Sequence, residues 1–132
     1  MTTPRFRFPK ASRLYLRKEI DELVQSGKAI HVSPLKVFYK LLSSENISMQ
    51  MAVSVPKRNF KLATERNRIK RQIREAYRLN CNDTATFFKS RGQKLQLMVV
   101  YNSKEPPDYV GLESKIILIL QRLQDMHERN SG

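Results

Sequence analysis

The sequence predicts an α/β (α+β) two-layer sandwich with the element order αββαβα. Two segments of alternating hydrophobicity, 35–41 and 47–55, follow a short amphipathic segment. A nearly apolar run, 95–101, lies between two longer segments with helical periodicity. The chain has 132 residues, 40% of them hydrophobic, which is enough for one modest core. We therefore expect a single domain over 1–132, with a basic tail over about 1–12 and a core over about 13–124.

Local sequence features predict where each helix and strand begins and ends. The first helix is expected over Arg17–Ser26, because apolar residues recur at helical spacing and Gly27 supplies a stop. The two alternating segments are expected to be strands, each with one face in the core, joined as a hairpin through 43–46. The apolar run 95–101 should be a central strand or one buried on both faces.

The remaining helices follow from the same periodicity. A long helix is expected over about 64–79 with Thr64 as its N-cap, then a break over 80–86 and a short segment, 87–93, ending in a turn. The last helix is expected over about 110–127, because its apolar residues form one stripe. We expect the helices to cover one face of the sheet.

Positive charge is concentrated in two parts of the chain. Lys and Arg total 25 against 12 Asp and Glu, a formal net charge of +13. Residues 1–18 contain six basic residues and no acidic one, and 57–78 contain nine basic residues against two acidic ones. Such an excess opposes compaction by self-repulsion, so it indicates a polyanionic partner, most commonly a nucleic acid.

The long predicted helix separates its apolar and basic side chains. At about 100° per residue, one face is apolar and suits the core, whereas the opposite face is basic. The apolar face holds Ile69, Ile73, Ala76 and Tyr77, and the opposite face holds Asn67, Arg71, Arg74 and Arg78, flanked by Arg68 and Lys70.

A solvated charged surface is the simplest alternative for such a helix. Two features favour phosphate binding instead. Only Glu65 and Glu75 are available for ion pairs along the helix, so the charges are not arranged for helix stability. Arg66 and Arg68 lie in the first turn, where the helix dipole disfavours cations unless an anion binds there.

The outward face of the first two predicted strands forms a second candidate surface. Phe38 lies between two lysines on a floor of small residues, an arrangement that suits a single strand with stacked bases. Phe38 covered by the first helix is an equally good interpretation, and both stay open. The residues of this surface are Lys36, Phe38 and Lys40 beside Gln50, Ala52 and Ser54, with Ile20 and Val24 as one wall.

Signals for catalysis or membrane insertion are missing from the sequence. His31 and His127 have no companions at metal-ligand spacing and are expected at the surface, and Cys81 has no catalytic partner nearby. No apolar run reaches the 18 residues of a membrane span, and the N-terminal segment lacks the features of a secretory signal. A single cysteine suits a reducing compartment, so we expect a cytoplasmic protein. Because no catalytic motif is recognisable, we expect that the chain is not a catalyst by itself.

The segment 66–78, which reads RNRIKRQIREAYR, resembles the RNR motif of the bacterial ribonuclease P protein subunit. The segment 53–58, VSVPKR, is similar to the strand that precedes this motif in the family. Arg13-Leu14 and the late strand followed by a helix also fit. The resemblance covers about residues 8–124.

The resemblance implies the αββαβα sandwich of a ribosomal-protein-like RNA-binding fold, with a left-handed β-α-β crossover around the RNR helix. It implies an accessory subunit that binds the catalytic RNA and the 5′ leader of precursor tRNA, and promotes 5′-end maturation of tRNA. The RNA performs the cleavage with Mg²⁺, which is held mainly by the RNA and the substrate and not by the protein alone. No membrane and no obligate protein partner are expected.

The resemblance, taken together with the residue patterns above, assigns residues to sites. The RNR helix contributes RNA-binding residues, namely Arg66, Asn67, Arg68, Lys70, Arg71, Arg74 and Arg78. The leader cleft consists of Ile20, Val24, Lys36, Phe38, Lys40 and Ser54. Further phosphate contacts are expected from Arg13, Lys57 and Arg58. The family usually carries phenylalanine where this chain has Ile20 and Val24, and its usual glycine before the RNR helix is absent from 59–62.

Two other functions share parts of this pattern. A general or ribosome-associated RNA-binding protein would have the same charge distribution without a role in tRNA processing. A membrane-surface protein would need a broad apolar helix face free for lipid, but the core requires Ile69, Ile73 and Tyr77.

Overall fold

The computed structural model describes residues 17–44 and 49–130. The predicted classes of element are confirmed, and the bounds of the first helix agree with the prediction. The elements are α1 (Arg17–Ser26), β1 (Lys28–Val32), β2 (Leu35–Ser43), β3 (Met49–Ser54), α2 (Ala63–Asn80), α3 (Asn82–Lys89), β4 (Gln93–Tyr101) and α4 (Tyr109–Asn130).

Two of these elements were not predicted. β1 pairs with β2 across the turn at Ser33-Pro34, so the hairpin joins these two strands. Only Val32 of β1 is buried, which explains why its sequence carries little strand signal. Only Cys81 separates α2 from α3, so the predicted break over 80–86 is wrong. The helix forms there because Thr84 and Phe88 pack into the core. The described order is therefore αβββααβα.

The sheet has the order β1-β2-β4-β3. The prediction that segments 35–41 and 47–55, now β2 and β3, form a hairpin is therefore wrong. β4 lies between them, antiparallel to β2 and parallel to β3. The almost apolar β4 takes this position because a strand buried on both faces belongs at the centre of a sheet. The path from β3 through α2 and α3 to β4 is a β-α-β crossover, and its left hand stays a prediction.

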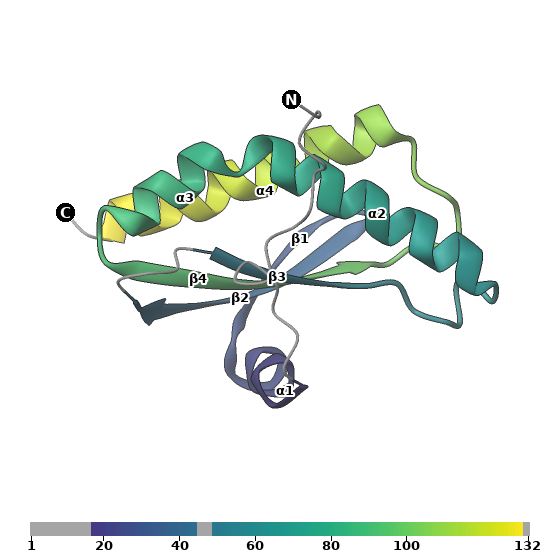
Figure 1. Cartoon of the computed structure of the whole chain (residues 1–132), viewed down its shortest axis with the longest axis horizontal. Helices are drawn as coiled ribbons and strands as arrows, with labels where there is room; N and C mark the ends of the chain where they lie inside the picture. Colours follow the sequence, from purple (N-terminus) through teal and green to yellow (C-terminus); the bar gives the residue numbers. More distant parts are fainter. Residues whose placement is uncertain (1–16, 45–48, 131–132) are drawn as a thin grey trace, which may run out of the picture.

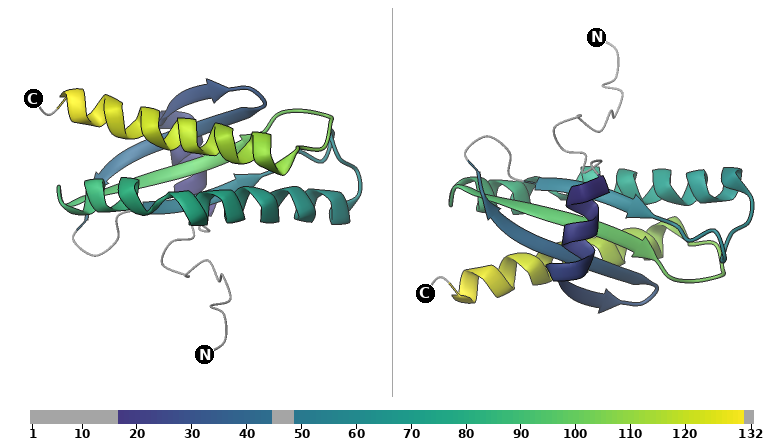
Figure 2. Two further views of the ribbon diagram at one scale, coloured as in Figure 1. Left: turned by 90° about the horizontal axis from the view of Figure 1, so that it is seen from above. Right: turned by 90° about the horizontal axis from the view of Figure 1, so that it is seen from below.

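Three helices cover one face of the sheet, and α1 lies across the strands on the other (Figures 1 and 2). The prediction that all helices share one face is therefore wrong for α1. Leu23 of α1 is completely buried, which anchors the helix to the sheet. A Cβ atom at Gly27 would lie only 2.3 Å from the Leu23 carbonyl oxygen and 2.9 Å from that of Tyr39. Glycine therefore permits the tight passage from α1 into β1.

The main core lies between the sheet and the layer formed by α2, α3 and α4. α2 and α4 run side by side over the sheet (Figure 2). α2 contributes the four predicted apolar residues, all buried: Ile69, Ile73, Ala76 and Tyr77. The helix starts at Ala63 with Leu62 in the N-cap position and no side-chain cap, so the prediction of Thr64 as N-cap is wrong.

Candidate nucleic-acid interface

The surface of α2 opposite the core carries the predicted basic stripe. Asn67, Arg71 and Arg74 are exposed, and Lys70 is half-buried beside them. The separation follows from the helical spacing, since burial of the apolar face places these residues on the outer side. Arginine side chains at this spacing present planar donors suited to phosphate oxygens.

Arg78 and Arg66, which were both predicted to bind RNA, have intramolecular partners. Arg78 has a side chain only 18% exposed, and its Nη2 lies 2.6 Å from the Glu75 carboxylate. Arg66 Nη1 donates hydrogen bonds to the carbonyl oxygens of Phe60 (2.8 Å) and Lys61 (2.9 Å). These carbonyls offset the unfavourable position of the Arg66 cation in the first turn. Arg66 therefore stabilises the loop before α2, a role that the sequence pattern did not reveal.

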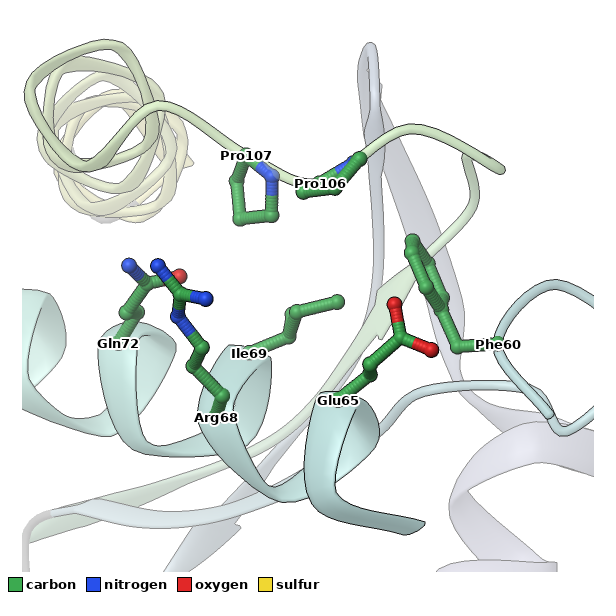
Figure 3. A pocket seen from close by; sticks show the side chains of 7 residues that line it. All are labelled: Phe60, Glu65, Arg68, Ile69, Gln72, Pro106 and Pro107. Atoms are coloured by element: carbon green, nitrogen blue, oxygen red, sulfur yellow. The ribbon is translucent and has the colours of Figure 1, made fainter. Parts of the chain in front are cut away.

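The side chain of Arg68 lies away from the stripe and borders a different surface. Figure 3 shows its side chain beside Gln72, at a hollow between α2 and the loop 102–108. Pro106 and Pro107 form the opposite wall of this hollow. The predicted RNR residues therefore divide between an outward stripe, internal contacts and the hollow.

The sheet face that supports α1 carries the second predicted surface. The strand register arranges it in rows across β2, β4 and β3, with paired residues on the same face. The rows are Lys36–Val100–Ser54, Phe38–Met98–Ala52 and Lys40–Gln96–Gln50. The predicted residues thus share a face, but β4 separates those of β2 from those of β3. Gln96, Met98 and Val100 were missed, because a nearly apolar run does not show which residues face which side.

Phe38 is half-buried on this face, and Lys36 Nζ lies 4.9 Å from its ring centroid. Lys40 and Ser54 are also half-buried. From α1, Val24 is 41% exposed and Ile20 is half-buried. The face therefore presents partly exposed apolar groups beside lysines, as binding of a single strand requires.

A buried amide connects α1 to this face. Gln96 is 3% exposed, and its Nε2 donates to Glu19 Oε2 of α1 (3.1 Å) and to Gln50 Oε1 of β3 (3.2 Å). A buried amide is costly unless it is hydrogen-bonded, so these two bonds favour one position of α1 on the sheet.

The other predicted residues lie away from these rows. Lys57 and Arg58 are exposed in the turn between β3 and α2, and Arg13 lies outside the described residues. His31 is exposed as expected, but the prediction for His127 is wrong. Its ring is half-buried against Tyr39 and Phe88, because the apolar stripe of α4 continues to its C-terminal end.

Chemical groups for catalysis are scarce in the part of the chain that the structure describes. No cluster of three or more His, Cys, Asp or Glu residues that could hold a metal occurs there. Burial raises the pKa of the Cys81 thiol, which disfavours the reactive thiolate. Over the same residues, no helix combines the length and apolar character needed to span a membrane.

Comparison with known proteins identifies the family. A model of the family Ribonuclease P matches residues 8–124. The chain belongs to the ribonuclease P protein family. The Ribonuclease P protein component of Porphyromonas gingivalis strain W83 is 40% identical over 111 residues, which cover 83% of this chain and 81% of the relative. That of Clostridium botulinum strain 657 is 32% identical over 113 residues, covering 86% and 95%.

Solved structures of ribonuclease P proteins share the fold. The protein from Thermotoga maritima superposes with a TM-score of 0.64 at 22% identity, covering 83% of this chain and 96% of that one. The Staphylococcus aureus protein has a TM-score of 0.64 at 17% identity, covering 86% and 96%. Family membership decides between the functions left open by the sequence. The chain is a tRNA-processing ribonuclease P protein, an accessory subunit of an endoribonuclease, and not a general RNA-binding protein.

Proposed function

We propose that the chain binds the catalytic RNA of ribonuclease P through the stripe on α2 and the 5′ leader of precursor tRNA through the sheet face beside α1. The observation that carries this proposal is the division of α2. Its apolar side is buried in the core, whereas Asn67, Arg71 and Arg74 lie exposed on the opposite side. An exposed basic stripe of this kind suits a phosphate backbone.

The α2 stripe would fix the protein on structured RNA. Arginine forks hold phosphate oxygens in defined geometry, and each neutralised phosphate releases counterions. Lys57 and Arg58, exposed in the turn before α2, extend the positive surface toward its N-terminal end. Binding of this kind is independent of sequence, so the RNA architecture would determine where the protein sits.

The sheet face would bind the leader as a single strand. Phe38 offers a ring for one base, and Lys36 and Lys40 on the same strand offer charges for the flanking phosphates. Val24 and Ile20 of α1 would bound the strand on one side. Because every base has a π-face, this surface would accept leaders of different sequence.

Magnesium would be bound mainly by the RNA and the substrate. Among residues 17–44 and 49–130, no cluster of three or more His, Cys, Asp or Glu residues could hold an ion, which supports this assignment. When bound to the RNA, Mg²⁺ would stabilise negative charge at the cleaved phosphodiester. The protein would contribute cations and position the leader. The cytoplasm is the compartment we propose for this assembly.

Replacement of Phe38 by alanine tests the leader assignment. Loss of one stacked base should weaken precursor tRNA binding by about 1–3 kcal/mol, with little effect on mature tRNA, which has no leader. Phe87→Ala is a matched control, because Phe87 is also half-buried and has Arg91 above its ring at 4.2 Å, but lies on α3. Binding of both substrates is measured with the assembled RNA–protein complex.

Folding is checked by thermal melting of both variants, since truncation of a half-buried ring lowers stability. Equal losses for precursor and mature tRNA in folded Phe38→Ala protein would show that Phe38 contributes only to packing. Equal effects of Phe38→Ala and Phe87→Ala on precursor binding would also show that Phe38 does not contact the leader.

A further inference from the structure

The hollow beside Arg68 has the chemistry of a small binding site. It lies between α2 and the loop 102–108, which connects β4 to α4, and has a free volume of about 50 Å³. This is the space of a few water molecules, so the hollow admits the edge of one planar ring and not a whole nucleotide. Its lining consists of Phe60, Glu65, Arg68, Ile69, Gln72, Pro106 and Pro107.

Three polar side chains of α2 border the hollow. Glu65, Arg68 and Gln72 lie on one side of α2, at positions i, i+3 and i+7, and Figure 3 shows them beneath the two prolines. In the described part of the chain, none of the three has a hydrogen bond or ion pair from its side chain. A carboxylate acceptor, a guanidinium donor and an amide with both functions are therefore available to a ligand.

The remaining lining is apolar. Phe60 and Ile69 are buried, 4% and 3% exposed, and contribute apolar side chains to the lining. The rings of Pro106 and Pro107 lie opposite α2 (Figure 3). A flat ligand with an apolar face and a polar edge matches this lining, and a nucleobase has both properties.

The charge pattern indicates which part of an RNA would enter. Lys61, which follows Phe60, and Lys104, in the loop that carries the two prolines, are exposed and would attract the RNA backbone. Glu65 disfavours a phosphate inside the hollow, because two negative charges would repel each other there. The carboxylate instead favours a base that donates hydrogen bonds from an amino group.

We propose that this hollow binds the edge of an unpaired guanine in the catalytic RNA. Glu65 would accept hydrogen bonds from N1–H and the 2-amino group of the base, while Arg68 would donate to O6. Uracil has no amino group and would bind less tightly. This inference rests on the proposed function and extends it, since it assigns Glu65, Arg68 and Gln72 to base recognition and not to the phosphate backbone.

Short oligoribonucleotides test the inference directly. The full chain is titrated with UUUGUUU and with UUUUUUU, and binding is followed by fluorescence anisotropy. We expect the guanine-containing oligomer to bind about tenfold more tightly, the discrimination of a modest bidentate contact. Glu65→Ala should remove this preference. Asp83→Ala is the matched control, because it also removes one acid from the first turn of a helix and should retain the preference.

A second arm identifies the source of the base. In the assembled complex, Glu65→Ala should weaken binding of the catalytic RNA about tenfold and leave the KM for precursor tRNA unchanged. Equal binding of the two oligomers by the unmodified chain would overturn the inference, as would an effect of Glu65→Ala confined to leader-bearing substrate. If the oligomers bind equally while the protein still promotes cleavage, the hollow assignment fails and the proposed function stands.

Discussion

The hydrogen bonds of the buried Gln96 side-chain amide are predicted to hold α1 in place on the sheet. Gln96→Leu keeps most of the side-chain volume but removes both hydrogen bonds, leaving the partners Glu19 and Gln50 in place. A typical hydrogen bond contributes about 1 kcal/mol net, and one to a charged group about 1.5–3 kcal/mol. Because Glu19 is half-exposed and water can replace part of its bond, we expect a loss of about 2 kcal/mol in the free energy of unfolding.

Urea unfolding followed by circular dichroism measures this loss. With an m-value of roughly 2 kcal/mol per molar urea, the midpoint should fall by about 1 M while m stays unchanged. Gln121→Leu, on the exposed side of α4, controls for the same substitution without buried bonds and should change stability by no more than about 0.5 kcal/mol.

The same variant connects stability to function. If the amide positions α1, folded Gln96→Leu protein should bind precursor tRNA more weakly and the catalytic RNA normally, because α2 lies on the other face of the sheet. A Gln96→Leu protein as stable as the unmodified chain would mean that the hydrogen bonds of Gln96 do not hold α1 on the sheet. It would show that the packing of Leu23 alone holds α1 in place.

Two further predictions concern the arginines of α2. Arg71→Ala should weaken binding of the catalytic RNA and make the slope of log affinity against log salt shallower by roughly 1 or less, as measured over a salt titration; an unchanged slope would mean that Arg71 faces only solvent. Arg66→Ala should instead lower the free energy of unfolding by about 1–2 kcal/mol, since the carbonyls of Phe60 and Lys61 lose a charged donor. Urea unfolding tests the second expectation, and a fully stable Arg66→Ala variant with weakened RNA binding would contradict it.

Much of the fold could be predicted because local pattern and tertiary packing agree. α1 ends where Gly27 allows a close approach to β2, and α2 buries the face that its periodicity indicates. Strand pairing could not be predicted in the same way. Alternation identifies the faces of a strand but not its partners, so the insertion of β4 between β2 and β3 left no local signal.

The candidate site shows the same limit at the level of single residues. Composition and spacing identified α2 as basic. They did not distinguish Arg66, which donates hydrogen bonds to backbone carbonyl oxygens, from the exposed Arg71. The hollow was not predicted, because Pro106 and Pro107 lie far along the sequence from Arg68 and meet it only in the folded chain.

Reconstituted cleavage of precursor tRNA tests whether the chain acts as an accessory subunit while the RNA is the catalyst. The purified chain, a bacterial ribonuclease P RNA and their mixture are each incubated with precursor tRNA over a range of Mg²⁺ concentrations. We expect no cleavage by the protein alone, and accurate 5′ cleavage by the mixture at a Mg²⁺ concentration where the RNA alone is slow. Cleavage by rigorously purified, RNA-free protein, or a mixture no more active than the RNA alone at every Mg²⁺ concentration, would contradict it.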